Sequence, residues 1–301
     1  MAFGYQVLGF GSGGGGATYE IDILVVAGGG SGASRWGGAG AGGGLVYKTS
    51  HEIITGQEYN VVIGAGGVGT PTGASDRETG YVGEDTTWGT ELTAKGGGLG
   101  GYDAVGGDGG SGGGAGGYSV KAGGSEIQTS EPGDSGTYGF GSAGGACYDG
   151  SPHYTPGGGG GAGAVGAAGT SSGPGAGGAG KDLSADFASE GVSGFFAGGG
   201  GGGFMNYTPF APGAAGGSGG GTAGGNLNTA SAASPANTGG GTGSGGMGPG
   251  TAMGSGNGGS GVICMKVLTA DYSGTVTGSP NTRTDGDYTI VEFTGDGSYT
   301  A

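Results

Sequence analysis

The sequence predicts a mainly β and irregular fold, in which a small β-sheet region joins a bundle of packed polyglycine-II helices and α-helix is essentially absent. Three observations predict it. The chain holds 96 glycines in 301 residues, against about 7% glycine in an average protein. Runs with strand character stand only near the two ends of the chain. The stretch from Gly191 to Met265 has no Asp, Glu, Lys or Arg, so no charge keeps its backbones apart.

The glycine content disfavours both of the ordinary elements. Each glycine in a helix interior costs about 1 kcal/mol relative to alanine, and a glycine strand offers a sheet no side chain to pack. The polyproline-II conformation remains, with about three residues per turn and no internal hydrogen bonds. Because buried backbone groups must be paired, such helices have to pack side by side, and the missing Cβ lets them approach closely. We therefore expect every residue with a side chain to lie on an outer face or at a turn.

Composition divides the chain into four parts. Residues 1–18 form an N-terminal attachment segment, residues 19–95 a β-rich region that contains glycine, residues 96–260 the polyglycine-II lattice with aromatic loops, and residues 261–301 a C-terminal strand and β-hairpin. Collagen is excluded because the chain has no strict Gly-X-Y repeat and only 10 prolines.

The strand predictions follow alternation and apolar runs. In the β-rich region we expect strands at residues 19–27, 45–47, 51–54 and 59–63, and two short strands within 86–94 that turn at Gly89. Near the other end we expect a strand at 261–267 and then a connector rich in Thr, Ser and Gly to residue 285. A hairpin follows, with strands 288–293 and 298–300 around a Gly295-Asp296-Gly297 turn.

The net charge of −15, with only 8 Lys and Arg, argues against nucleic acid as a partner, because phosphate contacts need a basic stripe. The two cysteines, Cys147 and Cys264, cannot form a dense disulfide framework. The first ten residues lack the basic and apolar regions of a secretory signal, and no run of 18 apolar residues predicts a membrane span. If this protein works outside a cell, we therefore expect it to be released when the cell that produced it lyses.

We expect no catalytic residue, cofactor or metal, and therefore no enzyme. The stretch Val25–Ala33 matches the G-x-G-x-x-A fingerprint of dinucleotide-binding proteins, but more glycine follows where that fingerprint needs a helix. His51 and His153 have no partner at metal-ligand spacing. Cys147 and His153 could be drawn as a nucleophile and its base, but no orienting acid accompanies them.

The candidate binding residues are the aromatic side chains and one histidine that interrupt the glycine. If their turns gather at one end of the bundle, they form a patch suited to sugars or protein surfaces. The receptor-contact candidates are Tyr138, Phe140, Tyr148, His153, Tyr154, Phe204, Tyr207 and Phe210. The loop 205–212 is the one we most expect to be exposed. Trp36, Phe195 and Phe196 belong to the same group, with an alternative that Phe195, Phe196 and Phe204 plug the lattice or pack against the sheet.

In their order, several motifs resemble the glycine-rich tail-fibre and tail-tip proteins of tailed bacteriophages. They are ILVVAGGGSG (23–32), GGGLVYKTS (42–50), EYNVVIGAGGVG (58–69), TTWGTELTAKGGG (86–98), GGSGVICMKV (258–267) and YTIVEFTGDGSYTA (288–301). The resemblance implies a virion component of the distal tail, in some members an adhesin that recognises a host cell-surface protein or polysaccharide and joins other phage tail proteins. It implies a possible homotrimer, or a single chain that caps a trimeric fibre. The alternative is a structural subunit of an extracellular filament without receptor specificity.

Overall fold

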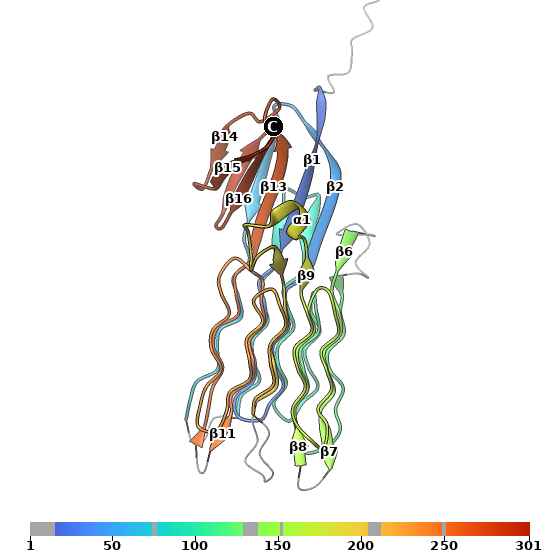
Figure 1. The fold of residues 1–301 in the computed structure, drawn as a ribbon, viewed down its shortest axis with the longest axis vertical. Helices are drawn as coiled ribbons and strands as arrows, with labels where there is room; N and C mark the ends of the chain where they lie inside the picture. Colours follow the sequence, from blue (N-terminus) through green and yellow to red (C-terminus); the bar gives the residue numbers. More distant parts are fainter. Residues whose placement is uncertain (1–15, 74–76, 129–137, 151–152, 204–211, 249–250) are drawn as a thin grey trace, which may run out of the picture.

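The computed structural model describes residues 16–73, 77–128, 138–150, 153–203, 212–248 and 251–301. The described chain forms a long body (Figure 1). Two β-sheets lie at one end, here called the sheet end, and glycine-rich segments run side by side from there to the opposite end, here called the tip. The fold is mostly strands and irregular structure, as predicted, and the helix α1 (Ser184–Phe187) is a single turn.

Two antiparallel sheets make the sheet end, one of six strands and one of five. The first has the order β15 (Asn281–Asp285), β16 (Tyr288–Phe293), β13 (Val262–Leu268), β1 (Thr18–Val26), β2 (Leu45–Ile54) and β6 (Gly139–Phe140). The second has the order β14 (Thr275–Thr277), β17 (Gly297–Thr300), β3 (Glu58–Val62), β4 (Thr86–Trp88) and β5 (Leu92–Ala94). Three two-stranded pairs lie outside these sheets: β7 (Tyr148–Gly150) with β8 (His153–Thr155), β9 (Lys181–Asp182) with β10 (Phe195–Phe196), and β11 (Met247–Gly248) with β12 (Thr251–Ala252).

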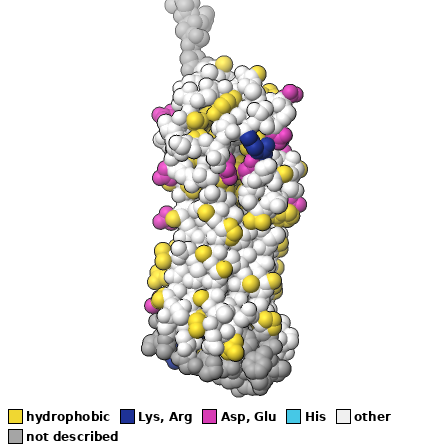
Figure 2. Space-filling view, turned by 60° about the vertical axis from the view of Figure 1, so that its left-hand side comes forward, with side chains coloured by type: hydrophobic (Ala, Val, Ile, Leu, Met, Phe, Trp, Pro, Cys, Tyr) yellow, Lys and Arg dark blue, Asp and Glu magenta, His cyan; other side chains and the backbone are white. Residues whose placement is uncertain are grey.

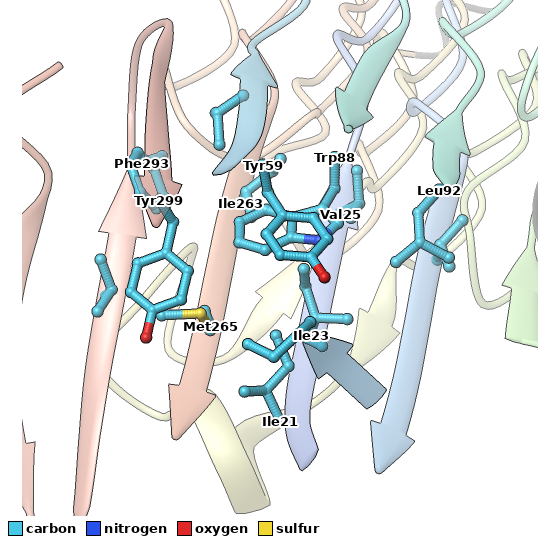
Figure 3. Close-up of a cluster of buried hydrophobic side chains, with 14 of the residues drawn as sticks. Ile21, Ile23, Val25, Tyr59, Trp88, Leu92, Ile263, Met265, Phe293 and Tyr299 are labelled. Atoms are coloured by element: carbon cyan, nitrogen blue, oxygen red, sulfur yellow. The ribbon is translucent and has the colours of Figure 1, made fainter. Parts of the chain in front are cut away.

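Strand β1 is buried on both faces, which explains why its sequence passes from alternation to an apolar run. Ile21, Ile23 and Val25 join the core between the two sheets, where the Tyr59 and Trp88 rings stack at 5.3 Å. Figure 3 shows these side chains converging from both sheets. Leu24 and Val26 face the other way, into a second core that contains residues from the segment carrying α1. The six-stranded sheet is thus the middle layer.

The predicted hairpin near the C-terminus is wrong. Strand β16 pairs with β13 and with β15, whereas β17 pairs with β3 and β14 in the other sheet. Phe293 and Tyr299 enter the same core from opposite sheets, so the residues between them cross from sheet to sheet instead of turning back. The hairpin is formed by β15 and β16 around Gly286, whose φ is +58°.

The expected connector before residue 285 contains β14 and β15. Both are edge strands. β15 carries polar side chains on both faces, and β14 has only three residues with Val276 as its single apolar side chain, so neither shows an apolar alternation long enough to predict a strand. The two separate strands expected at 45–47 and 51–54 form one strand, β2. Ser50 takes a φ of +52° within it, and its N–H donates to Asp22 at 3.0 Å beside a register shift in the pairing with β1.

Hydrogen bonds between the glycine segments repeat every three residues. In the segment 38–44, the amides of Gly38, Ala41 and Gly44 donate to residues 95–101. Those of Ala39 and Gly42 donate to residues 157–160, and those of Gly40 and Gly43 to residues 239–242. Its carbonyls in turn accept amides from Gly30, Gly114 and Gly200 on three further segments. The segment is therefore hydrogen-bonded on every side, with the period expected of a three-residue helix.

The spacing between these segments leaves no room for a side chain at many glycines. A Cβ on Gly38 would lie 1.8 Å from the carbonyl oxygen of Gly114, and one on Gly28 would lie 2.1 Å from that of Ala65. Real Cβ atoms essentially never come within 3.0 Å of such an atom. Glycine is thus required at these positions by the close approach of two backbones.

Small side chains also lie inside the lattice, which corrects the expectation that side chains other than glycine stay outside. Ala39 and Ala41 are fully buried. The buried hydroxyl of Thr242 accepts the Gly32 N–H at 3.0 Å and donates to the Gly256 carbonyl at 3.2 Å. A short hydroxyl can replace a direct backbone bond because it supplies both a donor and an acceptor.

We expect Gly38→Ala to destabilise the protein by about 3 kcal/mol or more, because the new methyl group forces two hydrogen-bonded segments apart. Gly295→Ala is the matched control, since Gly295 has a φ open to other residues and a Cβ added there would have no atom within 4 Å. Urea denaturation of both variants measures the effect. Equal stability of the two variants would contradict the packing described here.

Candidate functional site at the tip

The turn at residues 34–37 lies at the centre of the tip, because the two segments that it joins are enclosed by others on all sides. Arg35 takes a φ of +56°, and the Gly37 N–H donates to the Ser34 carbonyl at 3.1 Å to close the turn. The Arg35 N–H donates to the Met253 carbonyl at 2.8 Å. This bond ties the turn to the strands β11 and β12, which lie at the tip in Figure 1.

A group of side chains from four turns packs around this centre. The Arg35 guanidinium lies 4.4 Å from the centre of the Trp36 ring. Trp36 meets Tyr118 edge to face at 5.5 Å and Tyr102 at 6.3 Å, and Tyr118 meets Tyr154 at 5.2 Å. We call Arg35, Trp36, Tyr102, Tyr118 and Tyr154 the tip cluster. Tyr118 is its most open member, with 43% of its surface exposed.

Three polar atoms of the tip cluster are buried and have no hydrogen-bond partner within the part of the chain that the structure describes. They are Arg35 Nε, Trp36 Nε1 and Tyr102 OH. The guanidinium of Arg35 donates from Nη2 to Met247 Sδ at 3.7 Å, and a thioether is a weak acceptor. An unmade hydrogen bond of a buried group costs about 1–3 kcal/mol, so the tip cluster keeps donors that a ligand could satisfy.

The structure separates the predicted contact residues between the two ends of the body. Tyr148 and Tyr154 lie at the tip on β7 and β8, and His153 lies on β8 without a described side chain. Tyr138 and Phe140 lie at the other end, where Phe140 pairs opposite Leu45 of β2.

Near Phe140, the Lys181 ammonium lies 4.1 Å from the centre of its ring, and the Lys48 ammonium lies 5.7 Å from that of Tyr138. Phe204, Tyr207 and Phe210, with most of the 205–212 loop, lie outside the described residues. Phe196 is fully buried in the second core beside α1, in agreement with the alternative that it packs against the sheet.

Two members of the tip cluster, Tyr102 and Tyr118, were not among the predicted contact residues. Both interrupt glycine runs, in GGLGGYD and GGAGGYS, so the same rule that selected the other aromatic residues could have found them. Arg35 was missed because a single sequence does not show which side chains surround a cation in space, and so cannot show that no carboxylate lies close to it.

Both cysteines are free and buried. The Cys147 Sγ accepts the Lys121 N–H at 3.2 Å and donates to the Ser119 carbonyl at 3.1 Å. Burial raises the pKa of the Cys147 thiol and that of Cys264, the opposite of what a nucleophile needs. Within the described ranges, no three His, Cys, Asp or Glu side chains cluster as metal ligands, and no helix is long and apolar enough to cross a membrane.

A separate cleft of about 450 Å³ lies at the sheet end, lined by residues that include Lys48, His51, Tyr59 and Glu91. His51 is only 5% exposed, and its Nε2 lies 2.8 Å from a carboxylate oxygen of Glu91. Burial and the nearby charge of Lys48 lower the pKa of His51, and Glu91 only partly opposes them. His51 and Glu91 thus connect β2 of one sheet to the β4–β5 turn of the other.

A lowered pKa in the folded state means that the unfolded chain binds a proton on His51 more readily. The stability that neutral His51 contributes is therefore complete above the ordinary pKa of about 6.5 and is lost as the pH falls below it. We expect the melting temperature of the wild type to fall more between pH 7.5 and pH 5.5 than that of His51→Gln. An equal fall in both proteins would show that His51 does not titrate in this way.

The family comparison matches residues 15–268 to the model of a glycine-rich domain. The chain therefore belongs to this glycine-rich domain family. No curated protein and no solved structure matches the chain.

Proposed function

We propose that this protein is a tail-fibre or tail-tip adhesin of a tailed bacteriophage, a rigid scaffold that presents turns at its tip for recognition of a receptor on the host cell surface. The observation that carries the proposal is the division of the body into two different ends. One end consists of sheets with a packed core, and the other gathers aromatic turns around Arg35 and Trp36. The order of the motifs along the chain, which resembles that family, supports the same function.

The sheet end is suited to attachment. Strand β1 begins there at Thr18, and β14 and β15 offer two exposed edges to other tail proteins. Edge strands present unpaired backbone groups to a partner. In this proposal the protein occupies the distal tail of the virion and is extracellular after host lysis.

The glycine segments would hold the tip at a fixed distance from this attachment. We propose that they are polyglycine-II helices, which the three-residue period of their hydrogen bonds supports. Figure 2 shows one face of this body, where hydrophobic side chains stand apart on a mostly uncharged surface and acidic side chains gather toward the sheet end.

Tyr118→Ser should lower the binding of the labelled protein to susceptible bacterial cells at least about tenfold, because one lost aromatic contact of about 1.4 kcal/mol has that effect. Tyr288→Ser is the matched control, since Tyr288 is similarly exposed (39% against 43%) but lies on β16 at the sheet end. Flow cytometry of cells from a panel of bacterial strains measures the binding. An unchanged affinity of Tyr118→Ser would remove the tip cluster from the receptor site.

The alternative function, a filament subunit without receptor specificity, makes a different prediction in the same preparation. It requires self-association and no binding to any strain. Sedimentation of the purified protein separates these cases and also distinguishes a single chain from a homotrimer.

A further inference from the structure

We infer that the tip cluster recognises an acidic group, a carboxylate or phosphate, carried on a cell-surface glycan, with Arg35 as the residue that binds the charge. This inference deepens the proposed function, since it names the chemistry of the receptor. It starts from the arginine at the centre of the tip, which is 8% exposed. Among the described residues, no carboxylate lies within 4.0 Å of its guanidinium nitrogens.

Its burial sets Arg35 apart from the other cations. Four of them lie within 3.5 Å of a carboxylate oxygen: Lys95, Lys121, Lys266 and Arg283. Lys48, Arg77 and Lys181 have no such partner among the described residues, but their side chains are partly or fully exposed to water. The chain has 23 Asp and Glu against 8 Lys and Arg, so acidic partners are abundant. A charge taken out of water needs a partner of opposite sign. Arg35 thus lacks an anionic partner, because the described chain does not itself supply one.

The surroundings of Arg35 fit an oxyanion. Its guanidinium carbon lies over the Trp36 ring, 4.4 Å from the ring centre, and a guanidinium donates in the fork geometry that carboxylates and phosphates accept. Nη2 donates to Met247 Sδ at 3.7 Å. An anionic oxygen is a far stronger acceptor than this sulfur, and the flexible methionine can move aside.

The rest of the tip cluster favours a sugar as the carrier of that charge. Trp36 Nε1 and Tyr102 OH are buried beside Arg35 and unpartnered in the described chain, and both can bond hydroxyl oxygens. Tyr118 and Tyr154 add aromatic surface next to them. A site with one cation, two neutral polar groups and aromatic walls matches a ligand with one charge, several hydroxyls and apolar C–H faces.

The two tryptophans allow a direct test. Trp36 belongs to the tip cluster and Trp88 is fully buried between the sheets, so the indole N–H resonance of Trp36 reports binding and that of Trp88 reports folding. Titration uses trigalacturonic acid, its methyl ester, glucose 6-phosphate, glucose and a hexaglutamate peptide. We expect the Trp36 resonance to shift with an acidic sugar and not with the ester or glucose. The two acidic sugars distinguish carboxylate from phosphate.

Variants assign the charge to Arg35. Arg35→Gln should weaken binding of the acidic sugar at least tenfold, Arg35→Lys should weaken it less, and Arg77→Gln should leave it unchanged. Arg77 is the matched control because it is exposed and stands in another turn of the tip. The Trp88 resonance shows in each case that the fold is kept.

The inference is overturned if the ester shifts Trp36 as much as the acid, if no acidic sugar does so, if only the peptide does, or if Arg35→Gln binds like the wild type. These outcomes are separable from failure of the proposed function. A protein that binds cells but gives no shift with acidic sugars keeps the adhesin proposal and loses this inference. A protein that binds acidic sugars but binds no cell keeps this inference and loses the adhesin proposal.

Discussion

The close approach of backbones that carry no Cβ is the constraint on which the rest of the structure depends. In most proteins, side chains keep neighbouring backbones apart and fill the space between them. Here the carbonyl of one segment occupies the place where the neighbour's side chain would be, as at Gly38 and Gly28. The amides then find carbonyls on all sides. Satisfied backbone groups thus replace an apolar core over most of the body's length.

This arrangement determines where recognition can take place. Because the lattice interior admits only glycine and small residues such as Ala39 and Thr242, large side chains are left to the surface, the turns and the sheet end. The sheet end uses its large side chains to build two cores. At the tip they surround Arg35 and Trp36. The proposed binding function of the tip rests on this division, and the proposed preference for an acidic sugar rests on Arg35 within it.

Much of the fold could be predicted from the sequence, because glycine excludes so many alternatives. The strands with apolar runs, such as β1 and β13, can be predicted from their own residues. Which strands pair with each other cannot be predicted in this way. Phe293 and Tyr299 are separated by only a few residues, and nothing local shows that they enter one core from different sheets. Strand β15 was missed because it is polar on both faces, and β14 was missed because it is only three residues long with one apolar side chain.

The candidate site was predicted less well, for a similar reason. Aromatic interruptions identified Tyr148 and Tyr154 at the tip, but the same signal selected Tyr138 and Phe140, which lie at the other end. Which end a turn occupies depends on how many segments precede it and in which direction each runs. Arg35 is buried and has no carboxylate nearby among the described residues, and both properties depend on residues distant in the chain.

Amide hydrogen exchange of residues 38–44, followed by NMR in the native protein, tests the central claim most directly. If these amides donate to neighbouring backbones as described, they exchange only when the whole lattice opens, with protection close to that of β1 and β13. Exchange at the rate of a free glycine-rich chain, while β1 and β13 remain protected, would contradict the account, because the glycine segments would then be ordered by something other than lateral hydrogen bonds.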